Sequence, residues 1–121
     1  MSDSKIAEAR YCVTLLTPEG EYTIGVAASE HIWDAAKANG IELPALCHQG
    51  YCLTCAGRLV GPGEFDQSDS RQYFPQDRAN GFVLLCTARP MSDLRILTHQ
   101  QWEMRRHRLA RGLPAPYALG L

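Results

Sequence analysis

Residues 47–55 read CHQGYCLTC and place three cysteines within nine residues, with Gly50 between the first two. A fourth cysteine, Cys86, is separated from Cys55 by 30 residues and ends the apolar run GFVLLC. Such a group can form disulfides, bind zinc or hold an iron–sulfur cluster, since cysteine sulfur serves in all three. The remaining sequence discriminates among these three kinds of site.

The composition is that of one ordinary globular domain. The chain has 121 residues, of which 45% are hydrophobic and 21% charged, enough for a single core. No apolar run approaches the ~20 residues of a membrane span, so stable membrane insertion is not expected. The first residues, MSDSKIAEAR, lack both a signal core and a transit-peptide composition, which predicts a cytoplasmic protein. In a reducing cytosol, clustered cysteines more often bind metal than form disulfides.

The order of expected elements predicts the fold. Two β-rich runs, 11–17 and 22–28, flank a connection with Pro and Gly that is typical of a hairpin. A helix should follow, with Ser29 as its N-cap and Gly40 at its end. Further strands are expected at 56–61, 81–86 and 93–99, with a short helix near 68–74. This order predicts an α+β protein with a β-grasp (ubiquitin-like) fold, a mixed sheet and one main helix.

The cysteine spacing separates the three kinds of site. Zinc knuckles usually pair their ligands as C-x2-4-C twice, whereas here the second half is Cys86 alone. Disulfides would leave one of the five cysteines unpaired. C-x4-C-x2-C followed by a distant cysteine is the plant-type [2Fe–2S] pattern. Such a negatively charged core needs backbone N–H donors near its sulfurs, and Gly50 and Gly57 allow a close backbone approach. Cys12 is expected to be a small buried residue of a strand.

Three longer stretches carry a family resemblance: DAAKANGIELP (34–44), CAGRLVGPGEFDQSD (55–69) and VLLCTARPMSDLRILTH (83–99). With the cysteine spacing, they make residues 11–100 resemble a plant-type [2Fe–2S] ferredoxin of cyanobacteria and chloroplasts. The resemblance implies a one-electron carrier rather than an enzyme, which passes electrons between a reductase or photosystem and acceptor enzymes. It also implies a [2Fe–2S] cluster with the ligands Cys47, Cys52, Cys55 and Cys86. Potentials of such ferredoxins lie at about −400 mV.

The cluster loop departs from the family pattern. Where the family commonly reads CRAGSCS followed by Ser or Thr and Cys, this chain has His48, Gln49 and Tyr51, with Leu46 and Leu53 replacing further small or polar residues. Fewer hydroxyl donors and an apolar cover should lower the potential, whereas a less acidic protein should raise it, so the net effect stays open. His48 is expected to be a surface residue of the loop, because four cysteines already complete the ligand set.

The expected partner surface also departs from the family. Photosynthetic members carry an aromatic residue and acids after the DQSD stretch, where this chain has Gln72 followed by YFPQ. Near the C-terminus, Gln101 and Trp102 replace an acidic pair that helps to dock the NADP reductase. Because such charges steer association, binding to that reductase should be weaker. An alternative function is a regulatory iron–sulfur protein that senses iron or redox status through a partner.

Both ends extend beyond the ferredoxin-like region, at 1–10 and 101–121. The second extension carries four arginines against one glutamate, although the net charge of the whole chain is −1. Its segment QQWEMRRHRLARG could form a helix of about three turns, closed by Gly112. It could be a solvated extension, a docking arm for one partner, or a segment that folds back over the domain. Redox proteins are the expected partners; nucleic acid is not, and the protein is expected to be a monomer.

Overall fold

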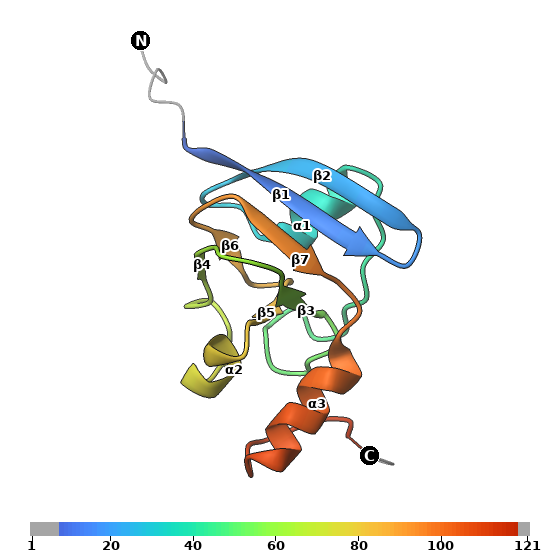
Figure 1. Cartoon of the computed structure of the whole chain (residues 1–121), viewed down its shortest axis with the longest axis vertical. Coiled ribbons are helices and arrows are strands. Elements are labelled where there is room, and N and C mark those ends of the chain that lie inside the picture. The colour runs from blue at the N-terminus through green and yellow to red at the C-terminus, as the bar shows by residue number, and fades with distance from the viewer. Residues whose placement is uncertain (1–7, 119–121) are drawn as a thin grey trace.

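Strands β1 (Arg10–Thr17) and β2 (Gly20–Ala27) form the predicted hairpin, although its turn is shorter than the four-residue connection expected. The computed structural model describes residues 8–118. Thr17 pairs with Gly20, so only two residues connect the strands. β1 also pairs in parallel with β7 (Leu94–Leu97), and β7 pairs with β3 (Ala56–Leu59), which pairs in turn with β5 (Phe82–Leu84). The sheet order is β2-β1-β7-β3-β5 (Figure 1).

This mixed sheet with few helices confirms the predicted α+β, β-grasp architecture. Alternation along the strands sends every second side chain to the core face, which is why these short segments form strands. A separate pair, β4 (Phe65–Asp66) and β6 (Arg89–Pro90), forms a small second sheet. The core residues contributed by β1, β2 and β7 are Val13, Leu15, Ile24, Val26, Leu94 and Ile96.

Helix α1 (Ile32–Ala38) begins later than predicted, and its N-cap is His31 rather than Ser29. Glu30 explains the shift, because its N–H donates to the Ala27 carbonyl and its side chain accepts the Ala27 N–H. These two bonds close a turn before the helix can start. The helix packs on β2 and buries Ile32, Ala35 and Ala36.

The short helix predicted near 68–74 is misplaced, since α2 spans Pro75–Ala79. Proline favours the first turn of a helix, where its missing N–H costs nothing, so Pro75 sets the start. The preceding segment is irregular, and its backbone and side chains bond to other parts of the chain instead of to a helix of their own.

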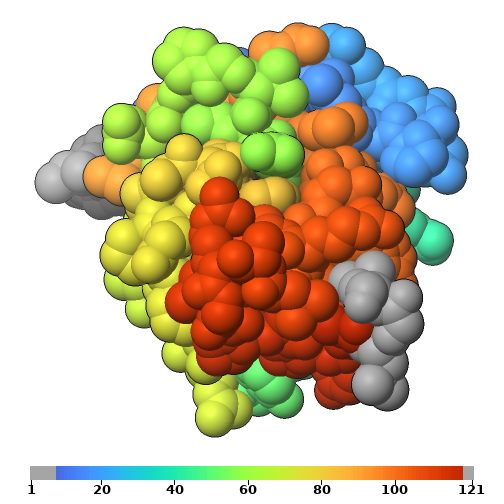
Figure 2. Space-filling model, turned by 60° about the horizontal axis from the view of Figure 1, so that its bottom comes forward, coloured from blue at the N-terminus to red at the C-terminus, as the bar shows by residue number. Residues whose placement is uncertain are grey.

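The three-turn helix predicted in the C-terminal extension is confirmed as α3 (Gln101–Ala110). It lies at the bottom of the molecule in Figure 1, with the β1–β2 hairpin at the top, and packs on α2 and β3. Figure 2 shows α3 and the following residues resting on the yellow segment around α2. This part of the extension therefore folds back on the domain. No helix within residues 8–118 is long and apolar enough to cross a membrane.

Candidate metal centre

The loop before β3 winds tightly because three of its residues adopt left-handed backbone conformations. His48, Gly50 and Leu53 have φ angles of 56°, 73° and 70°. Only glycine suits the middle position, since a Cβ on Gly50 would lie 2.6 Å from the Ser70 hydroxyl and 2.7 Å from that of Thr87. His48 and Leu53 hold the same conformation with side chains, which is strained and must be supported by the surrounding structure.

The four predicted ligands come together as two pairs. The sulfurs of Cys55 and Cys86 lie 3.1 Å apart, and the Cys52 side chain is close enough to Cys47 to help lower the pKa of its thiol. Among residues 8–118, no three Cys, His, Asp or Glu side chains converge as a site for a single metal ion would require. Two thiolates per iron is what a [2Fe–2S] cluster takes, so two pairs of thiols suit a binuclear cluster.

Electrostatics around Cys47 favour a thiolate. Partial burial would raise the pKa of its thiol, but backbone N–H groups of Tyr51, Gln49 and Cys52 donate to the sulfur and bring the pKa to about 7. The Gln49 nitrogen lies 3.3 Å from that sulfur. These are the backbone donors that a negatively charged cluster requires, and they come from the tightly wound loop.

In the second pair, the Cys55 thiol donates a hydrogen bond to the Cys86 sulfur. A hydrogen bond from Cys55 lowers the pKa of Cys86, helped by the backbone N–H of Gly50 and opposed by burial. The same bond, with burial, raises the pKa of Cys55 well above its ordinary value. A thiol that is costly to ionise alone becomes a ligand only when a metal replaces its proton, so this pair is suited to metal binding.

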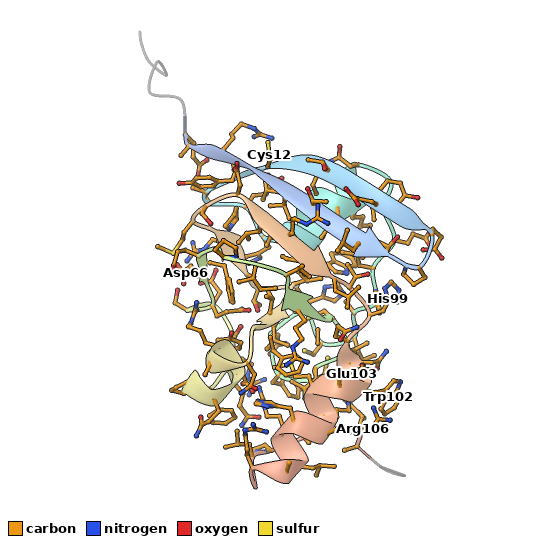
Figure 3. The ribbon with its side chains drawn as sticks, viewed as in Figure 1. Cys12, Asp66, His99, Trp102, Glu103 and Arg106 are labelled. Atoms are coloured by element: carbon orange, nitrogen blue, oxygen red, sulfur yellow. The ribbon has the colours of Figure 1, made fainter. Side chains whose placement is uncertain are left out.

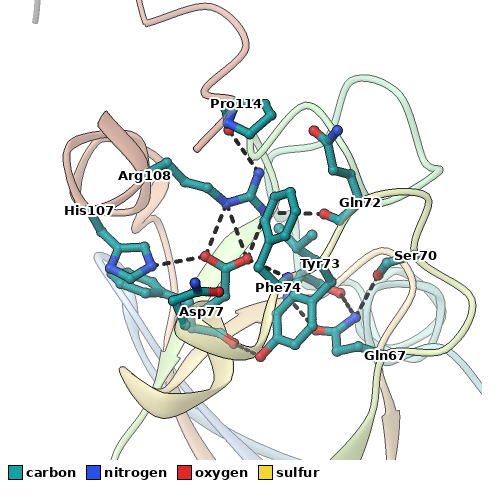
Figure 4. A network of polar contacts seen from close by, with 12 residues as sticks. Gln67, Ser70, Gln72, Tyr73, Phe74, Asp77, His107, Arg108 and Pro114 are labelled. Atoms are coloured by element: carbon teal, nitrogen blue, oxygen red, sulfur yellow. Dashed lines mark hydrogen bonds and ion pairs between the residues drawn. The ribbon is translucent and has the colours of Figure 1, made fainter. Parts of the chain in front are cut away.

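A buried polar network, which the sequence did not predict, supports the cluster loop. The Gln67 side chain donates to the Ser70 hydroxyl at 2.8 Å and accepts the Leu84 N–H at 2.6 Å (Figure 4). The next backbone N–H groups, of Arg71 and Gln72, donate to the carbonyls of Gln49 and Gly50. Segment 67–72 therefore holds the loop in place, and its DQSD signature has this structural role.

Two other sequence predictions near the loop have different outcomes. His48 is exposed, as expected, and its ring stands edge-on against Trp33, with centroids 4.6 Å apart. The prediction that Cys12 is buried is wrong, because Cys12 lies on the outer face of β1, opposite the core-facing Val13. Figure 3 places it at the far end of the molecule from α3. Leu53 is fully buried within the core, whereas Tyr51 is half-exposed beside the site.

The model of the family described as "2Fe-2S iron-sulfur cluster binding domain" matches residues 16–91. This chain belongs to that family. A ferredoxin-2 of Synechococcus is 38% identical over 96 residues, which cover 79% of this chain and 90% of the relative. A heterocyst ferredoxin of Nostoc is 41% identical over 95 residues, covering 77% and 95%. The protein is thus a plant-type [2Fe–2S] ferredoxin, which carries electrons and is not an enzyme.

Solved structures agree with this assignment. Pectocin M2 superposes with a TM-score of 0.67 and 32% identity, over 76% of this chain and 33% of that one. The ferredoxin reductase in carbazole 1,9a-dioxygenase superposes with a TM-score of 0.60 and 28% identity, over 74% and 28%. This chain spans a third or less of either structure.

Proposed function

We propose that Cys47 and Cys52 bind one iron of the cluster and that Cys55 and Cys86 bind the other. The observation that carries this proposal is the two-by-two pairing of the thiols inside a loop whose N–H groups point at the sulfurs. When bound, the cluster accepts and releases one electron. The chain holds its ligands in fixed positions, so little has to reorganise when the charge changes.

The electron enters and leaves on the side of Cys47. Of the four ligands, Cys47 alone is not buried, and the preceding Leu46 is 58% exposed. An exposed apolar residue next to a redox centre suits brief contact with a partner, because apolar contact needs no charge to be desolvated. The buried pair, Cys55 and Cys86, lies against the core and anchors the cluster from behind.

The partner surface differs from that of the acidic photosynthetic ferredoxins. The half-buried Gln101 and the exposed Trp102 occupy the positions of the acidic pair, and Arg106 lies exposed on the same helix. In Figure 3, Trp102 and Arg106 project from the outward side of α3. Without those acids, steering toward a basic reductase is weaker, so the physiological reductase has a less basic docking surface. The ferredoxin domain itself is residues 11–100, with the extensions 1–10 and 101–121.

Steady-state kinetics with a photosynthetic ferredoxin–NADP reductase test this function. The holo protein should reduce cytochrome c through that reductase, with a higher Michaelis constant at low salt than an acidic plant-type ferredoxin. Arg106→Glu, which reverses an exposed charge, should lower that constant, and the difference should vanish at high salt because the interaction is screened. Equal Michaelis constants for the two ferredoxins at low salt would contradict the partner proposal. A reduced protein that transfers no electrons would contradict the carrier function.

A further inference from the structure

Arg105, in the middle of α3, is buried against the cluster loop. Its side chain is 1% exposed, and one guanidinium nitrogen donates to the Cys52 carbonyl at 2.9 Å and to the Thr54 hydroxyl at 3.2 Å. The other two nitrogens donate to the Gln101 side chain at 2.6 Å and to the Pro116 carbonyl at 2.8 Å. The arginine therefore ties α3 and the chain after it to the backbone of a proposed ligand.

All of these acceptors are neutral, so none of them compensates the charge of Arg105. Arg108, one turn later, is equally buried but pairs with the Asp77 carboxylate at 2.8 Å. Within residues 8–118, no carboxylate lies at ion-pair distance from Arg105. Burial of a cation without an opposite charge is unfavourable, so an anion is expected beside it. Desolvation lowers the pKa of Arg105, and Cys52 is the first group that opposes this effect.

We propose that the Arg105 guanidinium is the counter-charge of the cluster and acts as a positioning residue that raises its reduction potential. The proposal rests on the ligand set proposed above. A cluster with four thiolates is anionic and gains a further negative charge on reduction. A fixed cation beside the Cys52 backbone stabilises the reduced form more than the oxidised form. Because the site is buried, salt does not screen this interaction as it screens surface charges.

The same contact links the redox state to the C-terminal helix. Since the coupling is reciprocal, an arginine that favours the reduced cluster is itself held more firmly when the cluster is reduced. The Trp102 ring, 4.6 Å from the guanidinium carbon, covers this contact on the solvent side. α3 should therefore be more firmly docked in the reduced protein than in the oxidised protein.

Redox titration of the holo protein tests the proposal with two matched variants. Arg105→Gln and Arg106→Gln remove the same charge from neighbouring positions of α3, one buried and one exposed. Arg105→Gln should lower the equilibrium constant for reduction about tenfold, a shift of about 59 mV to more negative potential. Arg106→Gln should change it less than about threefold, because surface charges are screened. Arg105→Lys, which keeps the charge, should restore most of the potential. Equal shifts for the two glutamine variants, or no recovery with lysine, would overturn the proposal.

A second measurement needs no variant. Amide hydrogen exchange in α3 should be slower in the dithionite-reduced protein than in the oxidised protein, while the β1–β2 hairpin should not change. Identical exchange in α3 would overturn the coupling even if Arg105→Gln did not load a cluster. The ligand proposal and the Arg105 proposal can be distinguished. A Cys86→Ser variant that still holds a cluster with wild-type properties would overturn the ligand set. Equal potentials of Arg105→Gln and Arg106→Gln, with intact clusters, would overturn only the role of Arg105.

Discussion

Asp77→Asn should strongly destabilise the protein, although the substitution is conservative. Asp77 and Arg108 are completely buried, and three donor–acceptor contacts of 2.8 to 3.1 Å join the two side chains (Figure 4). His107 adds a fourth contact to the carboxylate at 2.9 Å, and the Phe74 N–H adds a fifth. Asparagine keeps the shape and an acceptor, but it removes the only negative charge that these contacts offer to Arg108.

The magnitude follows from burial. Removal of one partner of a buried ion pair costs about 3–5 kcal/mol, because the remaining charge stays desolvated. For a domain of this length that corresponds to a fall in melting temperature of roughly 12–20 °C. Since most domains have only about 5–15 kcal/mol of stability, this one change should consume a large part of it. The penalty should appear in urea unfolding of the holo protein, followed by circular dichroism.

The control makes the same substitution in a solvated ion pair. Asp69 contacts Arg89 and His31, but its side chain is 40% exposed, so Asp69→Asn should cost at most about 1 kcal/mol. A double-mutant cycle with Arg108→Gln should give a coupling energy of about 1–3 kcal/mol. Additive effects, or a cost for Asp77→Asn no larger than for Asp69→Asn, would refute the view that this pair fastens α3 to α2.

Two further predictions concern the cluster and pH. Cys86→Ser should abolish the visible absorbance of the [2Fe–2S] cluster and the electron paramagnetic resonance signal of its reduced form. The control Cys12→Ser, on the exposed outer face of β1, should change neither. Normal spectra of Cys86→Ser would contradict the ligand set. Burial lowers the pKa of His107 below its ordinary value near 6.5, against the opposing effect of Asp77. Because the unfolded chain then binds more protons, stability present above about pH 6.5 should be lost as the pH falls toward the lowered pKa. The urea concentration at the unfolding midpoint should therefore decrease as the pH is lowered from about 7.5 to about 5.5 in the wild type, and decrease less in His107→Gln. Equal decreases in the two proteins would contradict this assignment.

The sheet and the cluster loop were predictable because both follow from residue types and spacings that can be read along a short stretch of sequence. The β-rich composition of 11–17 and 22–28, with Pro and Gly between them, predicts the hairpin, and the cysteine spacing is a count of residues. Helix starts were less predictable: Ser29 is a good N-cap by type, but Glu30 closes a competing turn with Ala27. The N-cap preference of Ser29 takes no account of this contact between the Glu30 side chain and the Ala27 N–H. The Gln67 network was likewise invisible, because its partners are distant in the sequence.

The C-terminal helix shows most clearly why hydropathy alone was insufficient. Its buried face consists of Met104, Arg105, His107 and Arg108, which lie at helical spacing. The apolar residues Trp102 and Leu109 lie outside this face, and both are more than 40% exposed. Arginines can line a buried face when acceptors surround them, and those acceptors come from residues 52, 54 and 77 and from the tail itself.

This placement also changes what a partner protein meets. Four arginines make the extension strongly basic in sequence, but Arg105 and Arg108 face inward, and only Arg106 and Arg111 are exposed. The positive charge available for steering is therefore about half of that counted from the sequence. On the proposed partner surface, the contrast with acidic ferredoxins therefore rests more on the acids that Gln101 and Trp102 replace than on added arginines. The inward pair instead acts on the protein's own structure, with Arg108 fastening α3 to α2 and Arg105 joining it to the loop that carries Cys52.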